Sequence, residues 1–568
     1  MTPKNKPSYS FANFFYFLKS VLAREKNLYW LIIIYGIGIS ILSLSIPIAV
    51  QYIIGNITFT ALLGPLVVIV IILIITLVFY ALLKVMQLYA THIFSKHFFA
   101  RIVGDIFNSF VYSDYEDFDR CNRTDIANRF FEIINIQKVF PVILFEGFSI
   151  IQQIIVGFIL ISFYHVSFLA FSIFIAFLTY LIIRVKGLKS LNNLYATSNS
   201  KYAVIDLLEN ISRMHREFKS GNAIAYSKRK VNTEVAEFLH NFDSYFSVLL
   251  SQSISFLSLY ILSSCGFLLI GSVLVFEGDI TVGQLVAMEL IVSTILIRLS
   301  EFSKYLDSFY ELSVSCKKIG TFYDINSEQI LGTVNAADVP ETASIITLNS
   351  VAVLHQNQSF AFKFSIAKNS INLMAFDNDT TRQMIYKLLL KFIKPTTGVL
   401  TYYDVDTELI NQHSLRDKIY MVDSTDMYNS TIEAYLTDGL DIAKTDIQAV
   451  LTHVQLDTKT EKLDIKQAIT PCGYPLSATQ IIRLKIAKAL LYKPDLLILG
   501  TVFDRIEYYK KQLILQAIRN KYPGLTLIHF THFTNMTSAF EYNQYFFVSA
   551  FETHQFDKQD DFIAYQHS

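Results

Sequence analysis

Charged side chains are scarce in this sequence. Only 17% of the 568 residues are Asp, Glu, Lys or Arg, while 52% are hydrophobic, and the mean hydropathy is +0.38. The charges balance at 48 basic and 48 acidic residues, so the chain lacks the basic excess of a protein that holds nucleic acid through phosphate contacts. This composition excludes an ordinary soluble protein and predicts a chain with long membrane-spanning segments.

Cysteine is also rare, and its spacing excludes two kinds of small-domain scaffold. The four cysteines are Cys121, Cys265, Cys316 and Cys472. They show no paired spacing, so the sequence predicts neither a zinc site nor a disulfide framework. The first apolar run is too long for a cleavable signal peptide, and a second run follows it at once.

The apolar residues are grouped into six membrane spans. No charged residue occurs between Asn27 and Leu83, and about 20 apolar residues suffice for one span, so this stretch holds two. Residues 1–27 mix aromatic and basic side chains and predict an amphipathic cytoplasmic elbow on the membrane surface. The predicted spans lie near residues 28–55, 62–90, 141–163, 166–186, 245–276 and 281–306, within a transmembrane domain at 28–325.

The connections between the spans alternate in length. Two long, helix-patterned connections at residues 91–140 and 187–243 are rich in Lys and Arg, as is the N-terminal arm. In membrane proteins, loops rich in Lys and Arg lie on the cytoplasmic side. This rule places the arm and both long connections in the cytoplasm. We therefore expect a multi-pass protein of the plasma (inner) membrane, with its N-terminus and C-terminal domain in the cytoplasm.

The character of the sequence changes after Asn326. Short strand-like runs begin at Ser344, Ile371, Leu496, Leu525 and Tyr545, and helical segments alternate with them. This alternation is typical of an α/β fold. We expect a separate α/β domain at residues 340–568.

Four landmarks in this C-terminal domain resemble those of ABC exporter half-transporters. They are KPTTGVLTYYDVD at 394–406, PLSATQ at 475–480, KPDLLIL at 493–499 and THF at 531–533. The family has 24 positions between the signature Leu and the Walker B Asp, and Leu476 to Gly500 here is 500 − 476 = 24. The resemblance implies six transmembrane helices followed by a RecA-like, P-loop-NTPase-like α/β domain with a helical subdomain.

The membrane half carries a narrower resemblance. SLSIPIAVQYIIGNITF at 43–59, NRFFEIINIQK at 128–138 and TVGQLVAMELIV at 281–292 resemble peptidase-lacking relatives of haemolysin-type, type I secretion exporters. This resemblance implies a dimer with a second half-transporter, and a periplasmic adaptor protein is a further implied partner. It also implies that the segments at 112–130 and 211–230 dock on nucleotide-binding domains.

Aligned with the family, the nucleotide-binding loop is AFDNDTTRQ at 375–383. A working P-loop needs glycines, a lysine and a hydroxyl for magnesium. Its glycine positions here hold Ala375, Asn378 and Thr380, its lysine position holds Thr381, and its hydroxyl position holds Arg382, or Thr381 with an offset of one. No Gly-x-x-x-x-Gly-Lys-Ser/Thr motif occurs anywhere in the chain. The sequence predicts a degenerate Walker A motif.

The other nucleotide-binding positions show the same departure. The Walker B aspartate and the catalytic glutamate are replaced by Gly500 and Thr501, which can neither bind magnesium nor orient water. The Q-loop position holds Asp423, the switch histidine is His532, and the adenine-stacking position is His355 or Leu354. The signature reads Leu476, Ser477, Ala478, Thr479 and Gln480.

These residues predict an ABC-type exporter subunit whose own site does not hydrolyse ATP. We expect no cofactor in that site, and ATP with magnesium only in a composite site shared with a partner. Three hypotheses remain. In the first, the chain pairs with an ATP-competent half to export a peptide, protein or other amphipathic substrate. The second is an exporter whose energy comes from elsewhere, and the third is a non-transporting membrane scaffold or regulator. Glu289 in the sixth span predicts either a substrate-pathway contact or a helix pairing.

Overall fold

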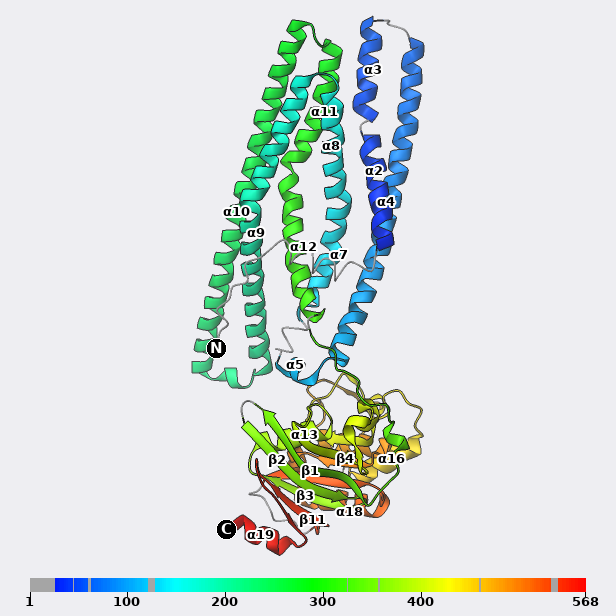
Figure 1. Ribbon diagram of the computed structural model, residues 1–568, viewed down its shortest axis with the longest axis vertical. Helices are drawn as coiled ribbons and strands as arrows, with labels where there is room; N and C mark the ends of the chain where they lie inside the picture. Colours follow the sequence, from blue (N-terminus) through cyan, green and yellow to red (C-terminus); the bar gives the residue numbers. More distant parts are fainter. Residues whose placement is uncertain are drawn as a thin grey trace. The chain divides into compact units, whose positions relative to one another are not determined.

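The computed structural model describes residues 26–43, 45–59, 63–120, 128–323, 325–355, 358–458, 461–532 and 540–567. The chain divides into two compact units, residues 1–327 and residues 328–568. Figure 1 shows that the first unit is built from long helices and the second from sheets and shorter helices. Residues 1–25 of the predicted elbow lie outside the described residues.

The first unit is helical throughout its described elements. In chain order they are α2 (Lys26–Ser43), α3 (Ser45–Phe59), α4 (Leu63–Val111), α5 (Tyr115–Arg120), α7 (Phe131–Pro141), the π-helix η2 (Val142–Gly147), α8 (Phe148–Ser162), α9 (Val166–Arg213), the 3-10 turn η3 (Glu217–Lys219), α10 (Gly221–Glu277), α11 (Val282–Ser300) and α12 (Phe302–Tyr323).

Six helical stretches among the described residues are long and apolar enough to cross a bilayer, which confirms the predicted number of spans. They run over Ile33–Ile54, Leu63–Val111, Phe131–Ser162, Val166–Arg213, Gly221–Glu277 and Val282–Gly320. The most apolar window of α4 has none of its residues buried, as expected where lipid covers the helix. Helices α4, α9 and α10 have 49, 48 and 57 residues, or roughly 70 to 85 Å, so they extend well beyond the hydrocarbon.

Small residues allow the spans to approach closely. A Cβ atom added at Gly157 of α8 would lie 2.3 Å from Cδ1 of Ile295 in α11, and one at Gly271 of α10 would lie 2.3 Å from Cδ1 of Leu285. Without a hydrophobic driving force between helices in lipid, such close packing supplies much of their association.

A buried ionic joint ties three helices of the first unit together. The carboxylate of Glu132 in α7 accepts hydrogen bonds from Lys201 Nζ at 3.0 Å and Tyr202 OH at 2.8 Å, both in α9. Its other oxygen accepts one from Ser315 Oγ of α12 at 2.5 Å. Because a buried charge is costly unless paired, this joint favours one arrangement of the three helices.

The second unit begins at Glu328, ahead of the expected residue 340, because its first residues are attached to it. Arg416 forms an ion pair with Glu328 at 2.5 Å, and Val334 pairs with Ile410 in a parallel bridge. The strands are β1 (Ser344–His355), β2 (Gln358–Ala367), β3 (Ile371–Phe376), β4 (Thr397–Tyr402), β5 (Val405–Asp406), β6 (Ile419–Val422), β7 (Ser430–Thr431), β8 (Ala468–Ile469), β9 (Leu496–Leu499), β10 (Thr526–His532), β11 (Gln544–Val548) and β12 (Thr553–Phe556).

The helices of this unit follow the same chain order. The α-helices are α13 (Asp379–Leu389), α14 (Gln412–Lys418), α15 (Ile432–Thr437), α16 (Lys444–His453), α17 (Ala478–Tyr492), α18 (Tyr508–Lys521) and α19 (Gln559–His567). The 3-10 turns are η4 (Ala336–Asp338), η5 (Thr407–Leu409) and η6 (Thr501–Arg505).

A six-stranded sheet of order β12-β11-β3-β10-β9-β6 forms the centre of the second unit, and a four-stranded sheet of order β2-β1-β4-β5 forms its other layer. Strands β11, β3, β10, β9 and β6 pair in parallel. All four residues of β9 are buried, as expected for a parallel strand covered on both faces. This arrangement confirms the predicted α/β class.

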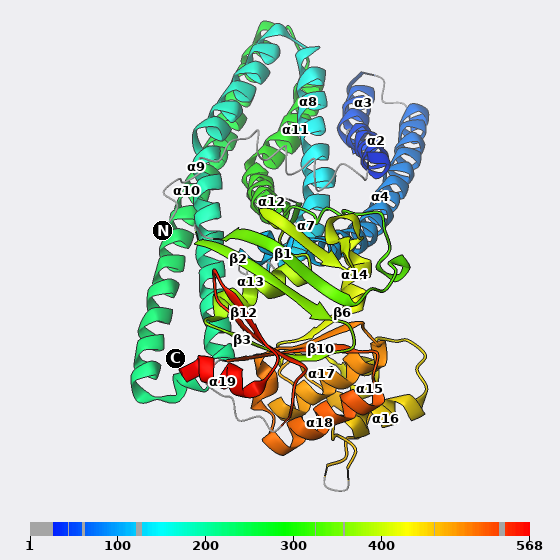
Figure 2. The ribbon, with the colours of Figure 1, turned by 60° about the horizontal axis from the view of Figure 1, so that its bottom comes forward.

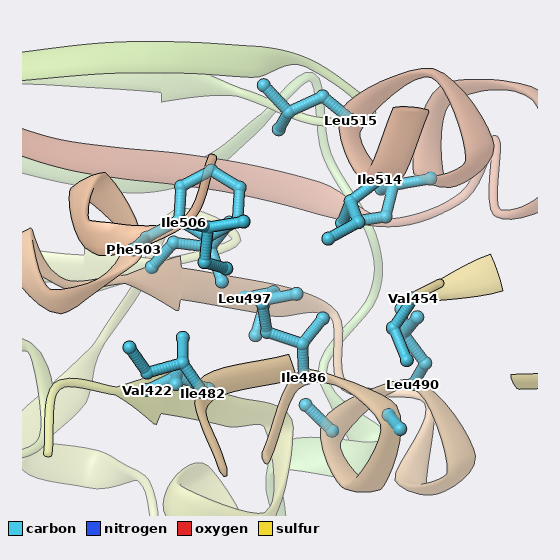
Figure 3. Close-up of a cluster of buried hydrophobic side chains, with 14 of the residues drawn as sticks. Val422, Val454, Ile482, Ile486, Leu490, Leu497, Phe503, Ile506, Ile514 and Leu515 are labelled. Atoms are coloured by element: carbon cyan, nitrogen blue, oxygen red, sulfur yellow. The ribbon is translucent and has the colours of Figure 1, made fainter. Parts of the chain in front are cut away.

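Two hydrophobic cores cover the two faces of the six-stranded sheet. Leu497 and Leu499 of β9 face a core with α15, α16, α17 and α18, whereas Leu496 and Ile498 face a core with α13 and the four-stranded sheet. Figure 2 shows α15 to α18 grouped on one side of the strands. Figure 3 shows side chains from β6, β9, α17, η6 and α18 meeting in the first core, with Val422 of β6 among them.

Replacing Gly157 tests the close approach of α8 and α11. We expect Gly157→Leu to cost about 1 to 3 kcal/mol, because the new side chain overlaps Ile295. The midpoint of thermal unfolding of the purified protein should therefore fall. Gly104→Leu in α4 is the matched control, since nothing lies within 4 Å of a Cβ at Gly104. Equal midpoints for the two variants would contradict this packing.

Candidate functional site

The carboxyl ends of the parallel strands meet at one edge of the six-stranded sheet. His532, the last residue of β10, pairs with Phe376, the last residue of β3. Val422 at the end of β6 pairs with Leu499 at the end of β9. Asp423 and Gly500 directly follow these two strands, so both lie at this edge. Ligands of open α/β sheets bind outside the carboxyl ends of the strands.

Only two residues, Asp377 and Asn378, connect β3 to α13. Asn378 caps the helix, because its Oδ1 accepts hydrogen bonds from the backbone N–H of Thr381 at 2.8 Å and from Thr381 Oγ1 at 3.1 Å. The backbone N–H of Asp377 donates to the carbonyl oxygen of Val548 at 3.2 Å. Two N–H groups near the start of α13 are therefore already hydrogen-bonded within the protein.

The structure places the loop positions predicted from the sequence in different environments. Ala375 is fully buried inside β3, between Thr531 of β10 and Phe547 of β11. Thr380 is exposed in the first turn of α13, whereas Thr381 is fully buried. Arg382 points back to the edge of the sheet.

The guanidinium of Arg382 joins two carboxylates. It forms ion pairs with Asp379 at 2.7 Å and with Asp423 at 2.5 Å, and its side chain is only 10% exposed. Burial alone would lower the pKa of this guanidinium, but Asp423 and Asp379 outweigh that effect and raise it. A permanent cation of the protein therefore lies where β6 and α13 meet.

Gly500 leaves room for the side chain of Asp423. A Cβ atom at Gly500 would lie 2.0 Å from Asp423 Oδ1 and 2.6 Å from its Cγ. The backbone of Gly500 also donates to the carbonyl of Val422 at 2.8 Å, which holds the two strand ends together. A side chain at the end of β9 is thus incompatible with the present position of Asp423. Thr501 follows as the first residue of η6.

The signature residues form the start of α17. The backbone N–H of Ser477 donates to Gln480 Oε1 at 2.7 Å, and the N–H of Gln480 donates back to Ser477 Oγ at 3.3 Å. Gln480 Nε2 donates to Glu461 at 2.9 Å. Leu476 packs against the core, Ala478 is exposed, and Thr479 is half-buried.

Glu461 holds this helix start in place. Its carboxylate binds Arg483 at 2.7 Å and Lys510 at 3.2 Å as well as Gln480. Burial raises the pKa of Glu461, but the hydrogen bonds from Arg483 and Gln480 dominate and lower it to about 2. The side chain of Gln480 is therefore committed to contacts within its own domain.

The other predicted residues do not take part in this ion-pair cluster. His532 lies at the same edge, exposed at the end of β10. His355 and Leu354 end β1, which belongs to the four-stranded sheet. Glu289 lies in α11 of the first unit, where its Oε1 accepts a hydrogen bond from Ser293 at 2.7 Å. Its other oxygen is buried and has no partner in the described part of the chain.

Sequence reasoning missed a buried network beside this edge. His529 of β10 contacts Asp504 through Nε2 at 3.1 Å and the hydroxyl of Tyr542 through Nδ1 at 2.8 Å. Thr531 also donates to Asp504, at 2.7 Å. Burial raises the pKa of Asp504, but His529 and Thr531 lower it to about 2. The available signal was a histidine between apolar residues of a strand, Ile528 and Phe530.

Comparisons with known proteins agree with this architecture. The family described as the ABC transporter transmembrane region matches residues 29–299. A solved structure of a bacterial Atm1-family ABC exporter with ATP bound superposes with a TM-score of 0.77 and 13% identity, over 97% of this chain and 99% of that one. The fold is that of an ABC exporter half. A region similar to the ABC transporter transmembrane family therefore precedes an α/β domain in this chain.

Curated relatives are more similar in sequence than this solved structure, but they match a smaller part of the chain. A protein of Rickettsia bellii (strain RML369-C), named as an export ATP-binding/permease protein, is 24% identical over 33% of this chain and 35% of its own length. The alpha-hemolysin translocation ATP-binding protein HlyB of Escherichia coli and the leukotoxin translocation ATP-binding protein LktB of Mannheimia haemolytica are each 21% identical, over 46% of this chain and 38% of their own. The chain therefore spans between a third and two fifths of the length of these relatives.

The packing of Asp423 against Gly500 predicts a non-additive pair of substitutions. Gly500→Asp alone should destabilise the second unit by about 1 to 3 kcal/mol, because its side chain overlaps Asp423. In an Asp423→Gly background the same change should cost less, with an interaction energy of about 0.5 to 3 kcal/mol. The measurement is thermal unfolding of the four proteins of this double-mutant cycle.

Gly524→Asp is the control for this cycle, since nothing lies within 4 Å of a Cβ there. Its effect should be small and the same in both backgrounds. Strict additivity of Gly500→Asp and Asp423→Gly would show that the two positions do not share space.

The low pKa of Asp504 predicts acid sensitivity in the second unit. The folded pKa of about 2 lies below the ordinary value of about 3.9, so this carboxylate stabilises the fold above about pH 4. That contribution, about 2 kcal/mol, is lost as the pH falls from about 4 to about 2. The protection of the β10 amides against hydrogen exchange, corrected for the intrinsic exchange rate at each pH, should therefore fall over this range. Asp504→Asn should exchange faster already at neutral pH and show a weaker pH dependence, whereas the exposed Asp441→Asn should behave as the wild type.

Proposed function

We propose that this chain is an ABC exporter half-transporter that does not hydrolyse ATP at its own nucleotide site. The transmembrane family match and the exporter fold over the whole chain support the exporter part of this proposal. The ion pair between Arg382 and Asp423 carries the other part, because it fills the site with charges of the protein itself.

The described residues do not fit a phosphate chain with magnesium. A phosphate-binding loop offers free backbone N–H groups, but here Asn378 and Val548 accept two of those near the start of α13. The edge carries three carboxylates, those of Asp377, Asp379 and Asp423, and the last two are paired with Arg382. Each close pair of like charges costs about 1 to 4 kcal/mol at about 4 Å, depending on the solvation of the site.

Among the described residues, the end of β9 does not supply the missing catalytic groups. The end of β9 carries Gly500 and Thr501, so no carboxylate stands there to hold magnesium through water or to orient an attacking water. Asp423 is a carboxylate one strand away, but Arg382 already neutralises it. We infer that magnesium and ATP are bound, if at all, in a composite site whose P-loop belongs to a second half-transporter.

The proposed transport role follows the named relatives. Two of them are named as translocation proteins for a haemolysin and a leukotoxin. We infer a peptide, protein or other amphipathic substrate, a second half-transporter as partner and a periplasmic adaptor protein. The same proposal places the chain in the inner membrane with its C-terminal domain in the cytoplasm. It also assigns Glu289 to the substrate path, because one buried carboxylate oxygen of Glu289 lacks a partner among the described residues.

One observation favours a second candidate, a membrane scaffold or regulator that does not transport. Both signature side chains that could serve a partner's nucleotide are engaged locally, Ser477 with Gln480 and Gln480 with Glu461. A partner site completed by this chain depends on Ser477, whereas a scaffold role does not.

Turnover measurements separate these roles. The full-length chain alone in lipid nanodiscs should show no magnesium-dependent ATP hydrolysis above empty nanodiscs. In complex with an ATP-competent half, hydrolysis should appear and fall at least tenfold with Ser477→Ala in this chain. ATP hydrolysis by the chain alone would overturn the proposal. An equal rate of hydrolysis by the complex with and without Ser477→Ala would favour the scaffold role. Ser549→Ala, at a serine outside the signature, is the control.

A further inference from the structure

Two lysines line the seam between α9 and α10, which lie side by side in both Figure 1 and Figure 2. Lys186 Nζ of α9 donates to the carbonyl oxygen of Ser251 at 2.8 Å, to Ser251 Oγ at 2.8 Å and to Ser255 Oγ at 2.7 Å. An ammonium group has three donors, so its position is fixed by α10. Lys189 lies one turn further along α9, on the same face and exposed.

The facing side of α10 is lined with hydroxyl groups. Serines recur there at intervals of three or four residues, at Ser244, Ser247, Ser251, Ser255 and Ser258. Asn193 of α9 donates to the carbonyl oxygen of Ser244 at 3.0 Å, so the polar contact continues past Lys189. Ser251 accepts from Lys186, and its own proton remains for a further acceptor. We call Lys186, Lys189 and these serines the lysine seam.

The charge of the lysine seam is not neutralised by the protein. Neither Lys186 nor Lys189 forms an ion pair with a carboxylate in the part of the chain that the structure describes. The next acidic residue of α10 is Asp243, and 251 − 243 = 8 residues, or about 12 Å, separate it from Ser251. On α12, Asp307 accepts a hydrogen bond from Tyr245. Two positive charges without a carboxylate partner among the described residues therefore lie together on this face.

The lysine seam lies at the depth of a membrane surface. Lys186 is 186 − 166 = 20 residues from the start of α9, about 30 Å, and Ser255 is 277 − 255 = 22 residues from the far end of α10, about 33 Å. The hydrocarbon core is about 30 Å thick. The seam thus lies where both helices leave the bilayer for their long extensions. On its membrane side α10 exposes Ile254 and Leu257, which are 54% and 50% exposed.

We propose that the lysine seam binds the phosphate of an anionic phospholipid headgroup, with the acyl chains along Ile254 and Leu257. Basic pockets between helices at a membrane surface attract such lipids, with each Lys near the surface contributing to the affinity. Lys186 and Lys189 supply the charge, and the Ser251 hydroxyl supplies a donor for a phosphate oxygen. A lysine that merely extends its ammonium group to the membrane interface would not need the three hydrogen bonds that hold Lys186 against α10. The proposal is independent of the nucleotide site.

The test compares lipid binding by matched charge variants of the full chain. Phosphatidylglycerol is titrated into the protein in neutral detergent micelles, and bound lipid is counted by native mass spectrometry. Lys186→Gln with Lys189→Gln should weaken binding on the order of tenfold. Lys228→Gln with Lys230→Gln removes the same charge from α10 about 70 Å from its Glu277 end and should leave binding unchanged.

Two further measurements distinguish the remaining outcomes. Lys186→Arg with Lys189→Arg keeps both charges and should keep the affinity, even where the glutamine variant is poorly folded. Phosphatidylcholine should not compete, and inorganic phosphate should not displace the lipid. Equal affinity of the glutamine variant and the wild type would overturn the proposal. Displacement by inorganic phosphate at the same concentration would show a soluble anion site instead.

Discussion

The carboxylate of Asp423 constrains the residues around it at the edge of the central sheet. Its oxygen fills the space beside the Cα atom of Gly500, which leaves no room for a side chain at the end of β9. Its charge requires a cation within reach, and Arg382 of α13 supplies one at 2.5 Å. The same arginine also binds Asp379, so the start of α13 is drawn toward β6 by an ion pair of the protein itself. A bound metal ion with phosphate could make the same connection, and here the connection needs no ligand.

The two units carry their charges in contrasting ways. In the first unit, the buried carboxylate of Glu132 in α7 is paired with Lys201 of α9. This buried charge specifies which faces of the two helices meet. In the second unit, the cores on both faces of the sheet depend on strand interiors such as Leu497 and Ile498, and not on the side chains at its edge. The fold and the chemistry of its edge are therefore separable, as expected when a site is built on a stable scaffold.

The fold could be predicted from the sequence because its signals are long and local. The charge-free run before Lys84 requires spans, and the buried strands β3 and β9 begin at the expected residues Ile371 and Leu496. The contacts within the site were harder to predict from the sequence. The resemblance names Asp423 and Gly500 as site positions, but 77 residues separate them (500 − 423), and only the strand register brings the two into contact. The contact of His529 with Asp504 likewise depends on how η6 folds back beside β10, which no local pattern encodes.

Equilibrium binding of magnesium and radiolabelled ATP to the purified full-length chain in nanodiscs tests the central claim most directly. The account predicts no saturable binding at millimolar ATP, because the ion pair of Arg382 and Asp423 fills the edge and three carboxylates repel the phosphates. Saturable binding at micromolar ATP that requires magnesium and is competed by ADP would contradict it. Such a result would mean that the Arg382–Asp423 ion pair opens readily and that this edge is an unorthodox but working nucleotide site.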